Sequence, residues 1–442
     1  MTESGNFRLS EQQRAWSDPG LPVPDPVATR QQLRQRWEAL TDERRRICAA
    51  IDERRDEYTE LLRDLVRIPS VNPSPEGERP LAMFVAEKMR ALGMEVRQME
   101  PQPTRVSNLG RLQGSGGKSQ VANLLYYAHL DTVPAGDEST WRFPPFSATI
   151  SDGRIYGRGA KDCKLGMAAA LAAAAAIGSA GIPLAGDVLI VTPADEETGG
   201  HLGIAAMLDA GWLKGIEACI YGEGVPERLT IGANGGVQFR VTTHGRSAHT
   251  AWKQLGTNAI LHAAAVAQAI DQTTFPDCEP HPIVPGQPVA SVNLISGGFK
   301  LNVVPDRCDL DVDLRFPPGY TAEKALGRIR AAIDNLRADE RYASLHTEIE
   351  VLSLMRPYAA SPEQPVVQAL GMCVEDITGK TPAAVGMPAS SDARWLYLDG
   401  HIPLVNYSFG NDSGHLPNEY ADIEGYIQNI KIYALASLLL LA

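Results

Sequence analysis

Hydrophobic residues in the N-terminal part of the chain recur at alternating spacings of three and four. The positions that share this spacing are Leu33, Trp37, Leu40, Ile47, Ile51, Tyr58, Leu61, Leu65 and Ile68. This period predicts a long amphipathic helix or a pair of helices, although Arg44 and Arg54 occupy two of the expected apolar positions. Two roles are open for it: packing against the body of the protein, or an arm used in oligomerisation. The residues before about 27 are polar and rich in proline, which indicates a segment with little core of its own.

From about residue 57 the hydrophobic pattern alternates between helical and strand periods. Helices are predicted for LAMFVAEKMRALG and GMAAALAAAAAIGSAG, and strands for MEVRQME, VANLLYYAH, DVLIVTPA and ACIYGE. Strands separated by helices favour a parallel sheet with right-handed crossovers. We therefore predict an α/β fold built on a mixed, mostly parallel sheet with helices on both faces.

Near residue 237 the pattern changes to that of a smaller two-layer α+β insertion. Strands are predicted for VQFRVTTHG, PVASVNLISGG and DLDVDLRFP, and helices near 257–271 and 321–336. After about residue 352 the first style returns, with a helix in EQPVVQALGMCVEDITG and a strand in HIPLVNYSFG. The predicted division is an N-terminal arm and helix (1–56), two parts of one main domain (57–236 and 353–442), and an inserted lid (237–352).

Acidic residues and histidines gather at the predicted strand ends of the main domain. They are His129, Asp131, Asp162, the run Asp195, Glu196 and Glu197, then Glu223, and finally His415. In open α/β sheets, sites form beyond the carboxyl ends of the strands. Each residue alone has an ordinary alternative, such as a helix cap for Asp162 or a solvated helix start for the acidic run. Together they would repel one another unless a dication lay between them, and imidazole with carboxylate suits zinc.

The spacing of His129 and Asp131 adds to this prediction. In an extended chain, residues two apart point to the same face, so imidazole and carboxylate project together from the strand end. A single histidine–aspartate pair with this spacing is only weak evidence for a functional site. Its place among the other strand-end residues gives it weight.

The composition indicates which binding partners and which cellular compartment to expect. The chain has 442 residues and a formal net charge of −12, which argues against non-specific binding to nucleic acid. Its six cysteines form no CxxC pair, and their low density fits free thiols in a reducing compartment. The N-terminus does not resemble a signal peptide, and no uninterrupted apolar run approaches 18 residues. We expect a cytoplasmic protein with neither nucleic acid nor membrane as a partner.

Six motifs, in order, resemble those of one known family. They are AHLDTVP, GRGAKDCKLGM, DEETGG, GEG, HGRSAH and GHLPNEY. They resemble the dinuclear zinc amidohydrolase and exopeptidase family, which includes acetylornithine deacetylase, succinyl-diaminopimelate desuccinylase, carboxypeptidase G and aminoacylase. The resemblance covers roughly residues 57–442 and implies a zinc-exopeptidase-like catalytic domain with an inserted lid. The first fifty or so residues lie outside it.

The resemblance implies two divalent metal ions, expected to be Zn²⁺, with Co²⁺ or Mn²⁺ as alternatives. It implies that His129 and Glu223 bind one ion, that Glu197 and His415 bind the other, and that Asp162 bridges both. Three protein ligands per ion and a bridging water would leave room for a substrate.

Two further carboxylates have implied roles beside the ions. Asp131 would support the ring of His129, as carboxylates behind metal ligands do. Glu196 would act as general base, taking a proton from the metal-bound water and passing it to the leaving nitrogen. The neighbouring Glu197 would then face another way, so that one adjacent pair divides ligation from proton transfer.

The lid supplies three more candidates. His249, in HGRSAH, would steady the oxyanion, often across to a partner subunit in this family, although an ordinary surface histidine is the alternative. Asn302 and Arg315 resemble residues that hold the substrate carboxylate, a task that suits the fork of arginine. A structural salt bridge is the alternative for Arg315. The resemblance also implies a homodimer, or a higher homo-oligomer, formed through the lid.

The chain departs from the family pattern at several positions. Cys163 follows Asp162 where a second acid or a glycine is common, and it is either a small buried neighbour or a modifier of metal preference. Leu165 and Gly166 replace the usual glycine pair. Glu223, rather than aspartate, leans towards the deacetylase and desuccinylase branch. The SSDAR loop, residues 390–394, resembles a loop near the substrate, with no assignable roles.

The expected activity is metal-dependent hydrolysis of an amide C–N bond in an N-acyl amino acid or a related small substrate with a carboxylate. A dipeptidase or carboxypeptidase, or a hydrolytic deaminase of an aromatic amine, is the alternative on the same metal site. A single-metal hydrolase and a non-catalytic binding protein are more remote. The binding protein would require loss of Glu196 or of a ligand, and every position is filled.

Overall fold

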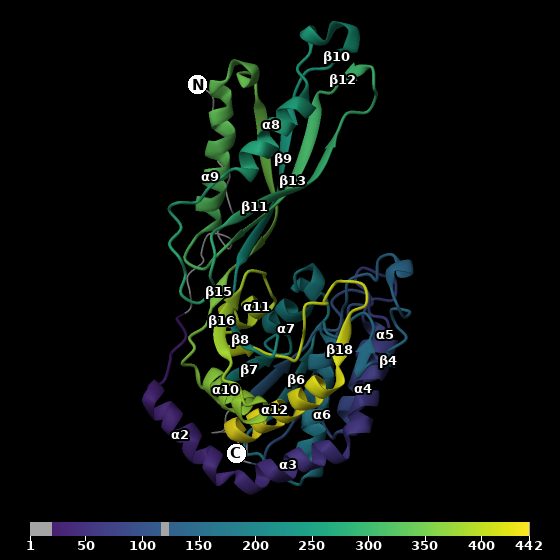
Figure 1. Cartoon of the computed structure of the whole chain (residues 1–442), viewed down its shortest axis with the longest axis vertical. Coiled ribbons are helices and arrows are strands. Elements are labelled where there is room, and N and C mark those ends of the chain that lie inside the picture. Colours follow the sequence, from purple (N-terminus) through teal and green to yellow (C-terminus); the bar gives the residue numbers. More distant parts are fainter. Residues whose placement is uncertain (1–19, 116–122, 442) are drawn as a thin grey trace. The chain divides into compact units, whose positions relative to one another are not determined.

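The computed structural model describes residues 20–115 and 123–441. The predicted polar segment before residue 20 lies outside the described residues. The described residues form two compact units (Figure 1). The smaller unit contains residues 232–359 and 386–390, and the larger unit contains the rest. The predicted lid, 237–352, falls inside the smaller unit.

The N-terminal arm of the larger unit consists of three helices. They are α2 (Pro26–Ala39), α3 (Thr41–Glu53) and α4 (Arg55–Arg67). The carboxylate of Asp25 caps α2 by accepting two backbone N–H groups. The helical period breaks at Leu40 and again at Arg54, so the continuous spacing spans three helices rather than one or two. Helix α3 packs against α6 and α12, and α4 against α6, which places their apolar faces on the body of this unit.

A nine-stranded mixed sheet has its central strands in the larger unit. Its order is β1-β2-β6-β3-β7-β17-β8-β15, and β16 also pairs with β8. The strands are β1 (Glu95–Met99), β2 (Ser107–Leu112), β3 (Leu124–Tyr127), β6 (Val188–Thr192), β7 (Ala218–Tyr221), β8 (Arg228–Ala233), β15 (Tyr358–Ala359), β16 (Ala383–Met387) and β17 (Leu404–Asn406). The central strands β6, β3, β7 and β17 run parallel. Tyr127 of β3 is level with Val191 of β6 and Tyr221 of β7, so the loops after these strands leave the sheet at one edge.

Helices and a small second sheet complete the larger unit. The helices are α5 (Arg79–Ala91), α6 (Lys164–Ser179), α7 (Ala206–Asp209), α10 (Pro365–Thr378), α11 (Ala393–Leu398) and α12 (Ile423–Leu441). The small sheet consists of β4 (Thr149–Ser151), β5 (Arg154–Tyr156) and β18 (Tyr420–Asp422). Helix α6 is buried along most of its length. A Cβ at Gly166 would lie 2.1 Å from the carbonyl oxygen of Gly222, so this glycine lets the start of α6 approach the loop after β7.

The smaller unit is an antiparallel sheet with two helices. The sheet order is β11-β13-β9-β14, from β9 (Gly235–His244), β11 (Val289–Gly297), β13 (Arg307–Phe316) and β14 (His346–Met355). Helices α8 (Ala259–Asp271) and α9 (Ala322–Asn335) pack on it. Their shared core includes Phe239, Val266, Leu310 and Ile329. A short two-stranded ribbon pairs β10 (Ala248–His249) with β12 (Val303–Val304).

The predicted fold class is confirmed: a mixed sheet with a parallel centre, helices around it, and a separate α+β unit. Several elements were not predicted, among them the strands β2, β8 and β14 and the C-terminal helix α12. Helix α12 is buried on nearly every side, so its sequence has little of the one-sided pattern that identifies a surface helix. Within the described part of the chain, no helix has the length and hydropathy needed to cross a membrane.

Candidate metal centre

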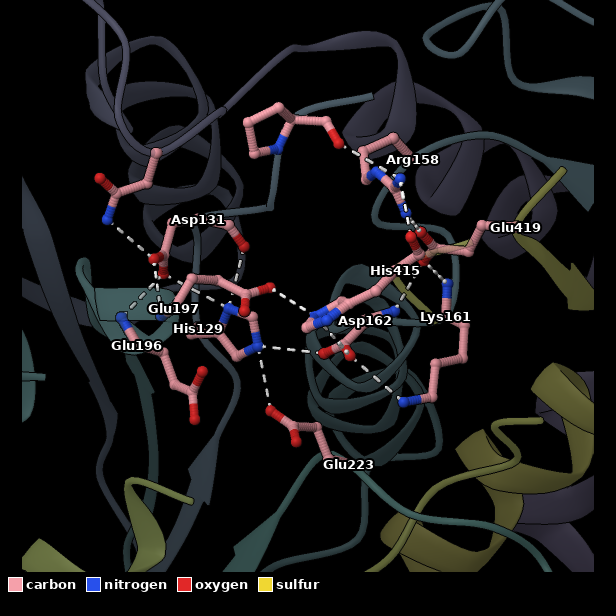
Figure 2. A network of polar contacts seen from close by, with 12 residues as sticks. His129, Asp131, Arg158, Lys161, Asp162, Glu196, Glu197, Glu223, His415 and Glu419 are labelled. Atoms are coloured by element: carbon pink, nitrogen blue, oxygen red, sulfur yellow. Dashed lines mark hydrogen bonds and ion pairs between the residues drawn. The ribbon is translucent and has the colours of Figure 1, made fainter. Parts of the chain in front are cut away.

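Loops after the four parallel strands and before α6 bring the predicted metal ligands together with Asp131 and Glu196 (Figure 2). His129 and Asp131 follow β3, Glu196 and Glu197 follow β6, Glu223 follows β7, and His415 lies in the loop after β17. Asp162 stands two residues before α6. Because the strands are parallel and in register, these loops meet at one edge of the sheet.

The ring of His129 is held in one orientation. Its Nδ1 lies 2.9 Å from the backbone carbonyl oxygen of Asp131. A carbonyl can only accept, so Nδ1 carries a proton and the lone pair of a neutral ring lies on Nε2. That atom points at Asp162 Oδ1, 3.2 Å away, and at Glu223 Oε1, 3.0 Å away.

The Asp131 carboxylate contacts several groups besides the imidazole ring of His129. It is fully buried and lies 3.4 Å from His129 Nδ1. It also accepts the backbone N–H groups of Glu196 and Glu197, at 3.1 and 3.0 Å, and the side-chain amide of Asn72 at 3.1 Å. Asp131 therefore ties the acidic loop after β6 to the histidine after β3.

Asp162 lies between the two histidines. Its Oδ1 faces His129, and its Oδ2 lies 3.6 Å from His415 Nε2. The ammonium group of Lys161 is 3.3 Å from the same Oδ2. One oxygen for each histidine is the arrangement that a bridging carboxylate requires.

Glu196 and Glu197 point in different directions from adjacent positions (Figure 2). Glu197 Oε1 lies 3.1 Å from His415 Nε2. Glu196 turns away from that contact, and its Oε1 lies 3.4 Å from the backbone nitrogen of Asp392 and 3.5 Å from the Tyr221 hydroxyl. The two acids therefore have different surroundings, which gives them different chemistry.

The crowding of carboxylates shifts their proton affinities. Burial raises the pKa of Glu196 well above its usual range, and the negative charges of Glu223 and Asp392 raise it further. Burial also raises the pKa of Asp392, to about 7. For Asp162, burial opposes ionisation, but the charge of Lys161 and the contacts with His129 and His415 hold its pKa far below the usual range.

The donor set fits a pair of metal ions. Two groups of ligand-type side chains have their donor atoms within 4.8 Å of one another: His129, Cys163 and Glu223, and His129, Asp162 and Glu197. Glu223 Oε1 is buried and accepts no hydrogen bond from the described residues, although His129 Nε2 is 3.0 Å away. Two lone-pair atoms this close require a cation or a shared proton. Burial alone would lower the pKa of His129, yet its partners Cys163, Asp131 and Asp162 raise it well above the usual range.

A second layer of residues, not singled out from the sequence, supports the centre. Glu419 accepts the backbone N–H groups of Lys161 and Asp162, at 2.9 and 3.0 Å. It also pairs with Arg158 at 2.7 Å in a buried position. Both supporting side chains, Arg158 and Glu419, lie inside the quoted motifs GRGAKDCKLGM and GHLPNEY. The motifs were therefore the available signal, although their spacing could not assign a partner to each charge.

Asp392 supports the centre from the SSDAR loop. Its carboxylate accepts the hydroxyl of Tyr127 and a guanidinium N–H of Arg394, both at 3.2 Å. Its backbone N–H is the group that faces Glu196. This loop thus has a definite role behind the acidic pair, which the sequence did not assign.

The three lid candidates belong to the smaller unit. The exposed ring of His249 accepts the N–H of Ala251 at its Nδ1, at 3.1 Å. Asn302 lies beside it, because its carbonyl oxygen accepts the N–H of Thr250 at 3.2 Å. Arg315 pairs with Asp313 through Nε and Nη2, at 2.6 and 2.9 Å, and its Nη1 donates to a serine hydroxyl. The salt-bridge alternative for Arg315 is therefore present in the structure.

This fold and this collection of side chains define a dinuclear metal-dependent hydrolase with an inserted α+β unit. The model of peptidase family M20/M25/M40 matches residues 125–438. The chain belongs to that family, as the motifs indicated.

Individual relatives are distant. The chain is 29% identical to a succinyl-diaminopimelate desuccinylase of Rhodospirillum centenum over 384 residues, which cover 84% of this chain and 94% of the relative. Human carnosine dipeptidase 1 has a similar structure, with a TM-score of 0.71 and 18% identity over 90% of this chain and 99% of that one. A dinuclear metal-binding M20 peptidase of Bacillus subtilis gives a TM-score of 0.65 and 17% identity over 88% and 99%. The two structures establish the fold and leave the substrate open.

Proposed function

We propose that this chain hydrolyses the amide C–N bond of an N-acyl amino acid, or of a related small substrate that carries a carboxylate. The observation that carries the proposal is the division of labour between Glu196 and Glu197. One acid faces a histidine of the cluster, and its neighbour is turned away with a raised pKa. A metallohydrolase needs both functions, ligation and proton transfer, next to each other.

Five side chains would hold the ions. His129 and Glu223 would take one, Glu197 and His415 the other, and Asp162 would bridge them. Zn²⁺ is the expected ion, because imidazole and carboxylate are ligands that it accepts, with Co²⁺ or Mn²⁺ as alternatives. When bound, such ions acidify a water molecule and polarise a carbonyl oxygen.

The chain's own residues would supply the proton transfers. Glu196 would remove a proton from the attacking water and deliver it to the departing nitrogen as the C–N bond breaks. Burial and the charges of Glu223 and Asp392 raise its pKa, which supports this role because it favours uptake of a proton from water. Asp131 would keep Glu196 in place through the backbone N–H that it accepts.

The lid residues would act on the substrate. With His249 Nδ1 accepting a hydrogen bond, the proton of a neutral ring lies on Nε2, which supports a role as donor to an oxyanion. Asn302 and Arg315 would hold the substrate carboxylate. Arg315 already donates from Nε and Nη2 to Asp313 and from Nη1 to Ser390, so a substrate carboxylate would be held by its remaining N–H groups.

The substrate class rests on two supports of unequal strength. The desuccinylase relative favours an N-acyl substrate, and Glu223 leans the same way. Similarity in fold to a carnosine dipeptidase keeps dipeptide cleavage as the second candidate. Deamination of an aromatic amine is a third chemistry for the same metal site.

A substrate screen tests the proposal. The protein is freed of metal, reloaded with Zn²⁺, Co²⁺ or Mn²⁺, and offered N-succinyl and N-acetyl amino acids, dipeptides and aromatic amines. We expect metal-dependent release of free amino acid from an N-acyl substrate. Turnover of dipeptides alone, or ammonia from an aromatic amine alone, would replace the N-acyl assignment. Metal-loaded protein that turns over no member of any class would contradict the proposal.

We also propose a homodimer through the smaller unit. The edge strand β11 exposes Val289, Leu294 and Ile295, and the nearby helix α8 exposes Ile260 and Leu261. An uncovered edge strand with apolar side chains favours pairing with another chain. A second copy of this strand would cover it.

A reducing compartment such as the cytoplasm is the proposed location. All six cysteines are free. Five of them are buried, which fits thiols that pack as small apolar groups and form no disulfides.

A further inference from the structure

Cys163 places a sulfur atom at the metal centre. It directly follows Asp162 and is the residue from which α6 starts. Its side chain is completely buried. The donor atoms of Cys163, His129 and Glu223 all lie within 4.8 Å of one another.

The surroundings of this thiol differ from those of a cysteine that only fills space. The sulfur lies 3.9 Å from the carbonyl oxygen of Gly222, which is a long distance even for a thiol hydrogen bond. Glu223 Oε1, in the same group, is buried and accepts no hydrogen bond from the described residues. Among the described residues, Cys163 is also the one cysteine that belongs to a group of metal-ligating side chains. A sulfur, an imidazole nitrogen and an unsatisfied carboxylate oxygen therefore surround one point.

We propose that Cys163 is a protein ligand of the metal ion held by His129 and Glu223, in addition to the bridging Asp162. On binding, the thiol would release its proton to solvent and coordinate as a thiolate. The other position, with Asp162, Glu197 and His415, would have only nitrogen and oxygen ligands. This inference rests on the proposed function, because it uses the same metal pair.

The consequence is a pair of unequal metal positions. A thiolate selects softer ions such as Zn²⁺ and Co²⁺ over Mn²⁺ or Mg²⁺, which prefer oxygen ligands. The position with sulfur would load first and hold its ion more tightly. The position without sulfur would exchange its ion more readily and accept Mn²⁺.

Spectroscopy of the full chain tests this proposal independently of activity. Metal-free protein is titrated with Co²⁺, and the near-ultraviolet absorption is followed for thiolate-to-cobalt charge transfer. We expect the band to grow with the first equivalent and to stay constant with the second. In Cys163→Ser the band is absent. In Cys373→Ser, which changes another fully buried cysteine in α10 of the same unit, the band is retained.

Zinc supplies the second measurement. X-ray absorption of wild-type protein loaded with one equivalent of Zn²⁺ should show a sulfur neighbour at about 2.3 Å. Cys163→Ser should weaken binding of that first Zn²⁺ by more than about 10-fold, with a smaller effect on Mn²⁺. Circular dichroism confirms that the variant is folded. If the variant does not fold, the X-ray absorption spectrum of the wild-type protein still shows whether sulfur binds the zinc ion.

Two results overturn the inference in distinguishable ways. Protein that binds two ions and hydrolyses its substrate, but shows neither the cobalt band nor a sulfur neighbour, removes Cys163 from the ligands and leaves the proposed function standing. Protein that binds no divalent ion at the centre overturns both.

Discussion

The Arg158 guanidinium and the Glu419 carboxylate form an ion pair at 2.7 Å that is almost completely removed from water. The same carboxylate accepts the backbone N–H groups of Lys161 and Asp162. The pair therefore fixes the backbone that carries the proposed bridging ligand. Its effect on the metal centre is indirect and can be measured.

Glu419→Gln should weaken both the fold and the metal centre. The substitution leaves the Arg158 charge buried without its partner, which typically costs about 3–5 kcal/mol in the free energy of unfolding. Urea unfolding and metal analysis measure the two effects. The control is Asp339→Asn, which breaks an exposed pair with Arg341 and should leave both quantities close to those of the wild type. Full metal content and unchanged stability in Glu419→Gln would show that the pair does not support the site.

Glu196→Gln and Glu197→Gln should separate proton transfer from ligation. Glutamine keeps the size of glutamate but cannot accept a proton. Glu196→Gln should keep both ions and lose about 100-fold or more in kcat. Glu197→Gln should lose metal first and recover part of its activity with excess metal. Metal content and kcat are measured side by side. The reverse pattern means that the two roles are exchanged, and full activity of metal-loaded Glu196→Gln rules out the general base.

His249→Ala should lower kcat while the metal content stays at two per chain. The reason is that His249 belongs to the smaller unit and its Nε2 is the donor proposed for the oxyanion. Kinetics with saturating substrate and metal analysis of the same sample check this. Unchanged kcat on the best substrate would remove His249 from the mechanism.

Glu78 should make stability fall as the pH rises through the mildly acidic range. Burial raises its pKa in the folded chain from 4.5 to about 7, with the charge of Asp131 adding to the effect and Arg105 opposing it. Between those two values the folded state holds a proton that the unfolded state has lost, so the free energy of unfolding decreases from about pH 4.5 to about pH 7. Above pH 7 this contribution does not change further.

Glu78→Gln should remove that part of the pH dependence. Glutamine does not titrate, so the stability of the variant relative to wild type should increase from pH 5 to pH 7.5. Urea unfolding at several pH values measures the difference. A constant difference over this range would mean that Glu78 is ionised in the folded protein throughout.

Leu294→Glu should convert the proposed dimer to monomers. Leu294 lies on the edge strand β11 with 65% of its surface exposed, and a charge there would be buried in a dimer. Leu352→Glu on β14, the opposite edge of the same sheet, is the matched control, with 47% exposed. Sedimentation measures the mass. A monomeric wild type refutes the dimer, and a dimeric Leu294→Glu places the interface elsewhere.

The site residues at the strand ends could be predicted from the sequence, because each one directly follows a recognisable apolar strand. His129 follows an apolar strand and Glu223 follows another, and parallel pairing then brings the two ends to one edge. The fold class could be predicted for the same reason, since alternation of helix and strand is visible in the hydrophobic period. The breaks in the N-terminal arm at Leu40 and Arg54 could not be predicted, because the apolar spacing continues through both.

The partners of buried charges needed the structure. Arg158 and Glu419 are separated by most of the chain, and nothing in the spacing pairs them. Asp392 stood in a motif without a role, because its contact with Glu196 is made by a backbone N–H that any residue type could supply. The pairing of Arg315 with Asp313 is local, two residues apart on β13, yet a capture role and a salt bridge use the same guanidinium.

The contact between Glu197 and His415 joins residues that are 218 positions apart in the chain. During synthesis the ribosome releases Glu197 well before His415, and the whole smaller unit emerges in between. A nascent chain can thus hold His129, Asp162 and Glu223 while it still lacks His415. All of the residues proposed to hold the first ion have then been made, and those proposed to hold the second have not. If both ions are needed for hydrolysis, the growing polypeptide would remain inactive until the segment that carries His415 has folded onto the larger unit.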